Sequence, residues 1–454
     1  MGQNDVMCDF SLITLPSESL VYDALEWFSA HFHGIHTSLS ILICCFGTVC
    51  NVANILVLTR RPMRTAVNTI LCGIASCDCV VMLSNLVFIT HFNLVANNSC
   101  IPAHWDRNWA LFTYVHAQVS VIGHSSSIWL SVAMGRLRYA TLASSTGPTI
   151  RPRKPEAEMR QAYLSILLVL TLVTLADIPN CLSYSIGPIP LQIVCGGNVS
   201  GGNGSMVWAY VPVQSELSQL HSCLIYRMAF WISGAVFKLI PCILLTTFLV
   251  VLVRILREVK ARRARLLGTR EKREGGSEES ADRTTRMLLT VIAVFLSTEL
   301  PQGVLAVASG LFSQEFKRNV YNNLGDILDL AALINSCATF VIYCSMSKQY
   351  RSEFSRIFLP KRLLVAAFPC LSWRRRRSAA AIHWNSELLK EPCGHSFSEN
   401  NPSLVPLHHR ASTVTAYQEA NGSLGRLGEE EELEPPFLTH SRSSHLLTTF
   451  STTI

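Results

Sequence analysis

Long apolar runs constrain this chain more than any other feature. About half of the 454 residues are hydrophobic (49%) and only 15% are charged. A membrane-spanning helix needs about 20 mostly apolar residues. Runs of this kind lie at residues 36–59, 66–92, 110–136, 160–184, 226–256, 284–311 and 323–346. A soluble helical protein would interrupt them with charge every turn or two, so we predict an all-α membrane protein, a bundle of seven transmembrane helices.

The basic residues give this bundle an orientation. No Lys or Arg precedes Arg60, whereas basic clusters follow the first, third and fifth runs, at residues 60–64, 151–160 and 254–265. Loops rich in Lys and Arg stay in the cytoplasm. We therefore expect a multi-pass plasma-membrane protein whose N-terminus is extracellular. The net charge of +7 follows from this topology and does not indicate nucleic-acid binding.

Two kinds of residue in the outer loops carry further expectations. Sequons for N-glycosylation occur at Asn97, Asn198 and Asn203. Cysteines predicted to lie outside, where disulfides persist, are Cys8, Cys100, Cys195 and Cys223. Four cysteines allow three pairings. We favour a bond from Cys100 to Cys195 or to Cys223, which would tie the first outer loop to the second.

The remaining chain divides by composition. We expect an extracellular N-terminal segment at residues 1–35, the seven-helix core at 36–346, and an amphipathic helix on the inner membrane surface at 347–358. Residues 359–454 are rich in Ser, Thr, Pro and Glu, which predicts a disordered cytoplasmic tail. Cys370 precedes the basic run 373–377, a pattern that fits palmitoylation and lipid contact as well as it fits a plain solvated basic segment.

Polar residues recur on single faces of two apolar runs. The polar residues of the third run make it the weakest of the seven by hydropathy. The face of the third run carries Ser120, His124, Ser127, Ser131, Met134 and Arg138, and that of the seventh carries Asp326, Asp329, Leu333, Ser336, Phe340 and Tyr343. The spacing of three or four residues places each set on one helix face. Any single Ser or His can be explained by backbone hydrogen bonding, but the shared depth predicts a polar cavity that opens outward and a polar track that leads inward.

Two charged residues lie near the middle of their apolar runs. Lys238 is one turn before Pro241, and Glu299 is two residues before Pro301. A charge at this depth costs several kcal/mol unless something polar meets it. We therefore predict that Lys238 and Glu299 pair directly or through water; the alternative is that each reaches separate water in the cavity.

The motifs of the core resemble those of rhodopsin-like G-protein-coupled receptors. The residues that match are Gly47 to Asn51, Asn68, Asp78, Arg138, Tyr139, Pro241, Pro301 and Tyr343. Within that family, the stretches 109–130, 230–242, 283–303 and 324–347 are most similar to invertebrate myosuppressin and FMRFamide-like neuropeptide receptors. The resemblance covers most of residues 40–358.

This resemblance implies an extracellular peptide ligand and a heterotrimeric G protein as partners, with kinases and arrestin acting on the tail. Peptides of this class end in Arg-Phe-amide, and their arginine needs a carboxylate. The expected ligand-binding residues are Ser120, His124, Phe237, Lys238, Glu299, Asp326 and Asp329. The expected G-protein contacts are Arg138, Tyr139 and Tyr343. The expected polar network, which in this family can hold sodium, is Asn51, Asp78, Ser127, Asn335 and Ser336.

Other functions fit less well. The pattern shows no catalytic constellation, so we expect no enzyme, no cofactor and no metal. A retinal pump would need a lysine in residues 323–346, which contain none. A transporter would show paired halves with broken helices. The serious alternative is a non-signalling adaptor or scavenger with the receptor fold, since Leu137 stands before Arg138 where an acidic residue is usual and Thr339 replaces the usual asparagine.

The end of the sequence predicts a PDZ-binding tail. Thr452 offers a hydroxyl and Ile454 an apolar side chain at a free carboxylate, the features that a PDZ groove binds as an added strand.

One extra glycine after Ile454 should abolish capture by PDZ domains in a pull-down while phosphorylation of the tail persists. Equal capture by native and extended tails would mean that the Ser/Thr cluster serves only kinases and arrestin.

Overall fold

The computed structural model describes residues 20–96, 99, 101–146, 155–195, 206–267, 275–312 and 316–358. Several predicted sites lie outside these ranges: Cys8, Asn97, Cys100, Asn198, Asn203, Cys370, Thr452 and Ile454. The described elements are α1 (Leu20–Leu58), η1 (Arg61–Met63), α2 (Ala66–Phe88), η2 (Ile89–Ala96), η3 (Pro102–Trp105), α3 (Arg107–Thr146), α4 (Pro155–Ala176), α5 (Ile178–Ser183), β1 (Tyr184–Pro190), α6 (Leu191–Val194), β2 (Trp208–Gln214), α7 (Glu216–Trp231), η4 (Ile232–Leu239), α8 (Ile240–Leu267), α9 (Gly275–Leu311), η5 (Lys317–Tyr321), α11 (Gly325–Met346) and α12 (Lys348–Phe358).

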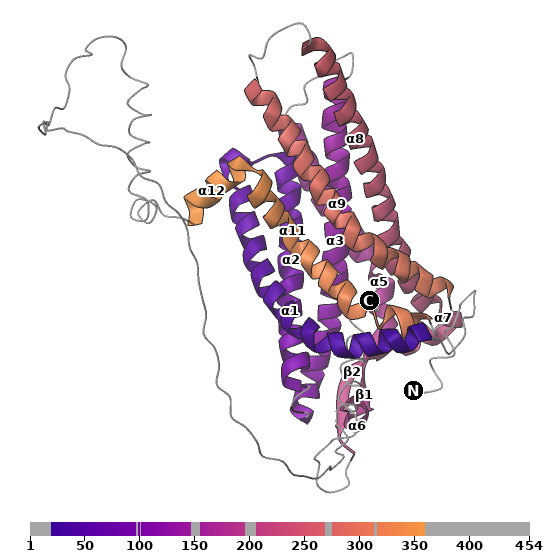
Figure 1. The fold of residues 1–454 in the computed structure, drawn as a ribbon. Coiled ribbons are helices and arrows are strands. Elements are labelled where there is room, and N and C mark those ends of the chain that lie inside the picture. Colours follow the sequence, from indigo (N-terminus) through magenta and orange to yellow (C-terminus); the bar gives the residue numbers. More distant parts are fainter. Residues whose placement is uncertain are drawn as a thin grey trace, which may run out of the picture. The chain divides into compact units, whose positions relative to one another are not determined.

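Six helical segments of the described chain are long and apolar enough to cross a membrane. They are Leu20–Leu58, Ala66–Ala96, Pro155–Ser183, Cys223–Val259, Leu289–Leu311 and Gly325–Met346. The helix α3 is long enough but too polar to join them, as its sequence predicted. It contacts α2, α4 and α8, so its polar side chains can face protein instead of lipid. Figure 1 shows these helices side by side in one bundle.

The first helix differs from expectation, because α1 begins at Leu20 and not near residue 36. Polar residues such as Asp23 and Glu26 interrupt the apolar pattern there. Hydropathy alone therefore placed the start of the first helix too late in the chain. In Figure 1 the first part of α1 lies across one end of the bundle. Contacts from this part to α11, described below, stabilise the extension.

A short antiparallel sheet, which the sequence did not predict, lies between the fourth and fifth spans. In it β1 pairs with β2 from Tyr184 opposite Gln214 to Pro190 opposite Trp208. Both strands contact α3. An apolar cluster that includes Phe92, Trp105 and Val211 joins β2 to η2 and η3. The hairpin therefore sits on the end of the bundle that the charge pattern assigns to the outside.

The fifth span is not a uniform α-helix. Between α7 and α8 the eight-residue η4 is a π-helix that contains Phe237 and Lys238. A Cβ atom at Gly303 of α9 would come within 3.4 Å of the Lys238 Cβ atom. This is ordinary van der Waals contact, so α9 packs directly against η4 at this position.

The final helix α12 is anchored on the opposite end from the hairpin (Figure 1). Tyr350 is fully buried, and its hydroxyl donates to Asn54 Oδ1 of α1 at 2.8 Å. Burial raises the pKa of Tyr350 above its ordinary value, so the hydroxyl remains a donor at physiological pH. Gln349 Nε2 donates to the Pro62 carbonyl at 2.7 Å. The placement of this helix on the membrane surface stays a prediction.

Close packing of α1 against α2 and α11 generates a stability prediction. A Cβ atom at Gly47 would overlap the Met82 side chain and lie 2.7 Å from Cys337 Sγ, whereas one at Gly34 would meet nothing within 4 Å. Gly47→Val should therefore lower the thermal denaturation midpoint of the purified protein, with a cost of about 1–3 kcal/mol for overpacking.

Gly34→Ala is the matched control on the same helix. It should be neutral or stabilising, because Ala is favoured over Gly in helices by about 1 kcal/mol. Equal midpoints for the Gly47 variant and the wild type would contradict this account of the α1 interface.

Candidate functional site

The outer end of the bundle holds a cluster of two histidines and two aspartates. His33 Nδ1 of α1 lies 2.9 Å from Asp326 Oδ2 of α11, and His36 Nε2 lies 3.2 Å from Asp329 Oδ2. His36 Nδ1 also lies 3.7 Å from Asp326 Oδ1. The side chain of Asp329 is 35% exposed, whereas that of Asp326 is 7% exposed. Asp329 is therefore the carboxylate that a ligand can reach from solvent.

A second polar cluster lies deeper, between α3, α9 and α11. Glu299 is completely buried, and its Oε2 atom lies 2.9 Å from His124 Nε2, which donates to it. Asn335 Nδ2 lies 3.5 Å from Glu299 Oε1. The structure thus gives the buried carboxylate a hydrogen-bonding partner on each of two neighbouring helices.

Lys238 and Glu299 were predicted to pair directly or through water; the direct pair is wrong, and the shared water stays a prediction. Both side chains are described, and no ion pair joins them within 4.0 Å; His124 occupies the place expected for the lysine. Lys238 is near enough to act on the carboxylate through its charge. The π-helical turn of η4 changes the direction in which Lys238 points compared with a regular α-helix, which explains why depth along the sequence was a poor guide.

The polar network predicted around Asp78 lies just inward of Glu299. Ser127 Oγ donates to Asp78 Oδ1 at 2.8 Å, and Ser131 Oγ donates to the Ser127 carbonyl at 3.0 Å. Asn51 Nδ2 donates to the Ser336 carbonyl at 3.1 Å. These bonds connect α2 to α3 and α1 to α11.

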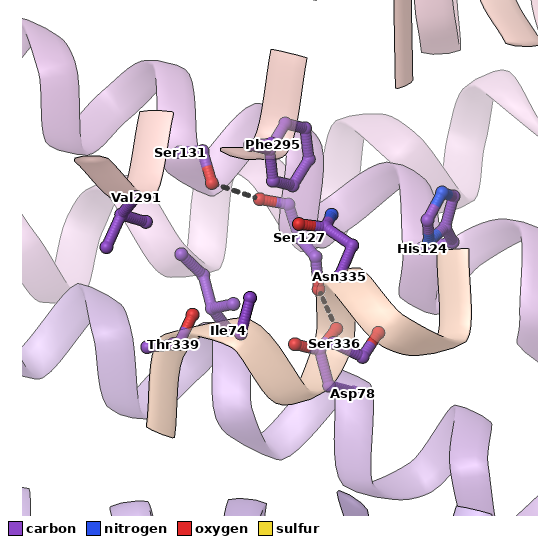
Figure 2. Close-up of a pocket in the computed structure, with 11 residues that line it drawn as sticks. Ile74, Asp78, His124, Ser127, Ser131, Val291, Phe295, Asn335, Ser336 and Thr339 are labelled. Carbon is purple, nitrogen blue, oxygen red and sulfur yellow. Dashed lines mark hydrogen bonds between the residues drawn. The ribbon is translucent and has the colours of Figure 1, made fainter. Parts of the chain in front are cut away.

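A cavity of about 20 Å³ lies beside Asp78, and its lining includes His124 and Asn335, the two hydrogen-bonding partners of Glu299 (Figure 2). Asp78, Ser127 and Ser336 line it together with His124 and Asn335. A volume of this size is enough for about one water molecule or a small ion. The polar track predicted from the sequence therefore runs from the Glu299 cluster to Asp78.

The inner end of the bundle brings two of the predicted G-protein contacts near each other. Tyr343 is buried, and its hydroxyl lies 3.5 Å from Asn68 Oδ1. The Arg138 guanidinium is near enough for its charge to act on the neutral Tyr343 hydroxyl. Within the described chain Arg138 forms no salt bridge, in keeping with the buried Leu137 that precedes it. Tyr139 is 41% exposed.

The remaining predicted residues are less closely connected. Ser120 is half-buried one turn outward of His124, and Phe237 is buried in η4. Cys195 and Cys223 are both disulfide-bonded. Since Cys100 lies outside the described residues, the pairing that we favour stays a prediction.

Sequence reasoning missed His33 and His36. They stand three residues apart, so they share a face of α1, and this spacing was the available signal. It was overlooked because the helix was expected to begin after them, and because their partners are 293 residues away in the chain.

The buried pair His124 and Glu299 generates the prediction for this site. Removing one partner leaves the other buried without its hydrogen-bonding partner. The double variant His124→Leu with Glu299→Leu should therefore lose less stability than the sum of the losses in the two single variants. We expect a coupling of about 0.5–3 kcal/mol in thermal denaturation of the purified protein.

The matched cycle combines Glu299→Leu with Lys238→Met. Its coupling should be smaller, because no direct contact joins those two side chains. A larger coupling for Lys238 than for His124, or strict additivity for His124, would contradict the observed pairing.

The sequence is similar to those of known receptors. Residues 38–361 match the family described as the serpentine type seven-transmembrane G-protein-coupled receptor chemoreceptor Srw. The G-protein coupled receptor dmsr-1 of Caenorhabditis elegans is 42% identical over 403 residues, which cover 82% of this chain and 77% of that protein.

Two relatives from Drosophila melanogaster are more distant. The sex peptide receptor is 23% identical, covering 67% of this chain and 68% of that protein, and the FMRFamide receptor is 20% identical, covering 70% and 52%. The family confirms the predicted seven-helix membrane bundle and the expectation that the chain is not an enzyme. The chain therefore belongs to the Srw group of serpentine seven-transmembrane G-protein-coupled receptors.

Proposed function

We propose that this receptor sits in the plasma membrane with its N-terminus outside and binds an amidated neuropeptide. The ligand would be a peptide of the myosuppressin or FMRFamide-like class with a C-terminal Arg-Phe-amide. The observation that carries this proposal is the outer carboxylate pair Asp326 and Asp329, held by histidines and partly open to solvent. The names of the relatives, which include a sex peptide receptor and an FMRFamide receptor, support a peptide ligand.

Charge complementarity explains how such a peptide would bind. An arginine guanidinium presents parallel N–H donors that match a carboxylate, and a partly desolvated pair of this kind is strong. Asp329 is reachable, and its present partner His36 is a weaker match than a permanent cation. A ligand arginine would replace that contact, with Asp326 in support.

The signal would then travel inward along α11. Asp329 and Asn335 are six residues apart, which is about 9 Å along a helix axis. A peptide at Asp329 therefore acts on Glu299 and Asp78 through the helix and the polar side chains, including Asn335 and Ser336, and does not need to touch them. Tighter binding to a minor conformation shifts the population toward it, and a tenfold shift needs about 1.4 kcal/mol of differential affinity.

The inner partners follow from the same proposal. An open inner face would expose Arg138, Tyr139 and Tyr343 to a helix of the heterotrimeric G protein. The cavity beside Asp78 has the size and the oxygen donors to hold sodium or water in the resting state. We extend the proposal to rhodopsin-like class membership, to tail phosphorylation with arrestin binding, and to a PDZ partner.

A second candidate function rests on one specific feature of the inner face. Arg138 follows the buried Leu137 and forms no salt bridge in the described chain, and Thr339 replaces the usual asparagine. A receptor altered in this way could bind peptide as an adaptor or scavenger without activating a G protein. Peptide binding would be the same in both cases, whereas nucleotide exchange on the G protein would not.

Asp329→Asn tests the proposed ligand contact. The variant should raise the half-maximal concentration of an activating amidated peptide about tenfold or more, because a charge-assisted bond contributes ~1.5–3 kcal/mol. Asp23→Asn, an exposed change on α1, is the control and should leave the response unchanged. Surface expression must be equal for the three proteins, and an unchanged response of Asp329→Asn at equal expression would remove this residue from the site.

A further inference from the structure

The outer histidine cluster has the composition of a transition-metal site. One potential ligand atom from each of His33, His36 and Asp326 lies within 4.8 Å of the others. The two histidines are on the same face of α1, and the aspartate is in the first turn of α11. Imidazole nitrogens combined with a carboxylate oxygen suit zinc and its neighbours in the first transition row.

The hydrogen bonding of His36 leaves one ring nitrogen ready to bind a cation. Its Nε2 atom bonds to Asp329 at 3.2 Å, so in the neutral ring Nδ1 carries a lone pair. That Nδ1 atom is buried and has no hydrogen-bond partner. It faces Asp326 Oδ1 at 3.7 Å, a distance too long for a hydrogen bond from a second ring proton.

The same distance suits two ligands of one metal ion. Atoms bound to a tetrahedral zinc at about 2.0–2.1 Å lie roughly 3.3 Å from each other. His33 Nδ1 lies 2.9 Å from Asp326 Oδ2, and His36 Nδ1 lies 3.7 Å from the other oxygen, Oδ1. These two distances bracket that value, and one ligand atom from each of the three residues lies within 4.8 Å of the others. Small side-chain rotations would therefore bring the three ligands onto one ion.

We propose that His33, His36 and Asp326 bind a divalent transition-metal ion, for which extracellular zinc is the expected example. Asp329 would orient His36 by accepting its Nε2 proton, which is the usual second partner of a metal-bound histidine. The fourth position of the ion stays open to water. A bound ion would join the first part of α1 to α11.

The site also bears on the ligand. An ion on Asp326, with Asp329 held against His36, competes with a peptide arginine for the same carboxylates. Zinc should then raise the concentration of amidated peptide needed for activation. This consequence rests on the proposed peptide function, whereas metal binding by the cluster does not.

Zinc binding to the full-length receptor in lipid nanodiscs tests the proposal without any agonist. Zinc chloride is the probe, and bound zinc is measured by equilibrium dialysis. The wild type should bind one more high-affinity zinc ion per receptor than the His36→Gln or Asp326→Asn variant. Asp329→Asn should weaken that binding about 10–100-fold. His31→Gln is the matched control, since His31 is exposed on the same helix and its ring bonds to the Trp27 carbonyl.

The control should bind as the wild type does, and equal high-affinity zinc in His36→Gln and the wild type would overturn the proposal. His33→Gln provides a second test if the His36 or Asp326 variant does not fold, because the His33 side chain is 21% exposed and its replacement disturbs little packing. Zinc should raise the thermal denaturation midpoint of the wild type more than that of His33→Gln. Equal rises in both proteins would also overturn the site.

Discussion

The interior of the bundle is organised around one buried carboxylate. Glu299 has no exposed surface, so neighbouring helices must supply partners for its charge. His124 and Asn335 do so, which fixes how α3 and α11 face α9. The polar stripe of α3 follows from the same requirement, because a helix that must solvate a buried acid cannot be uniformly apolar. The cavity that reaches Asp78 extends this polar interior toward the end of the bundle that carries α12.

Much of this fold could be predicted from the sequence, because the membrane imposes a length and a composition on every span. The apolar runs and the basic clusters were sufficient for the seven helices and for the expected orientation. The polar stripes were sufficient to select His124, Ser127 and Ser336 as interior groups. Asp78 and Asn335 were expected there from the resemblance to rhodopsin-like receptors.

The rest depended on information that hydropathy does not contain. The extension of α1 before residue 36 is too polar to register as a span, and it is stabilised by His33 and His36 contacting aspartates 293 residues away. The partner of Glu299 was chosen wrongly because depth does not determine direction, and η4 turns Lys238 by a π-helical segment. The β1–β2 hairpin carries prolines, such as Pro188 and Pro212, which are unfavourable in strands taken alone.

We propose that an amidated peptide activates a G protein by occupying the outer carboxylates Asp326 and Asp329. The most direct measurement is nucleotide exchange on purified heterotrimeric G proteins, stimulated by the receptor in lipid nanodiscs with a panel of Arg-Phe-amide peptides and their free-acid counterparts. At least one amidated peptide should accelerate exchange, and its free-acid form should be much weaker. Binding of such peptides with no acceleration of exchange by any G-protein class would contradict it and favour the adaptor or scavenger function.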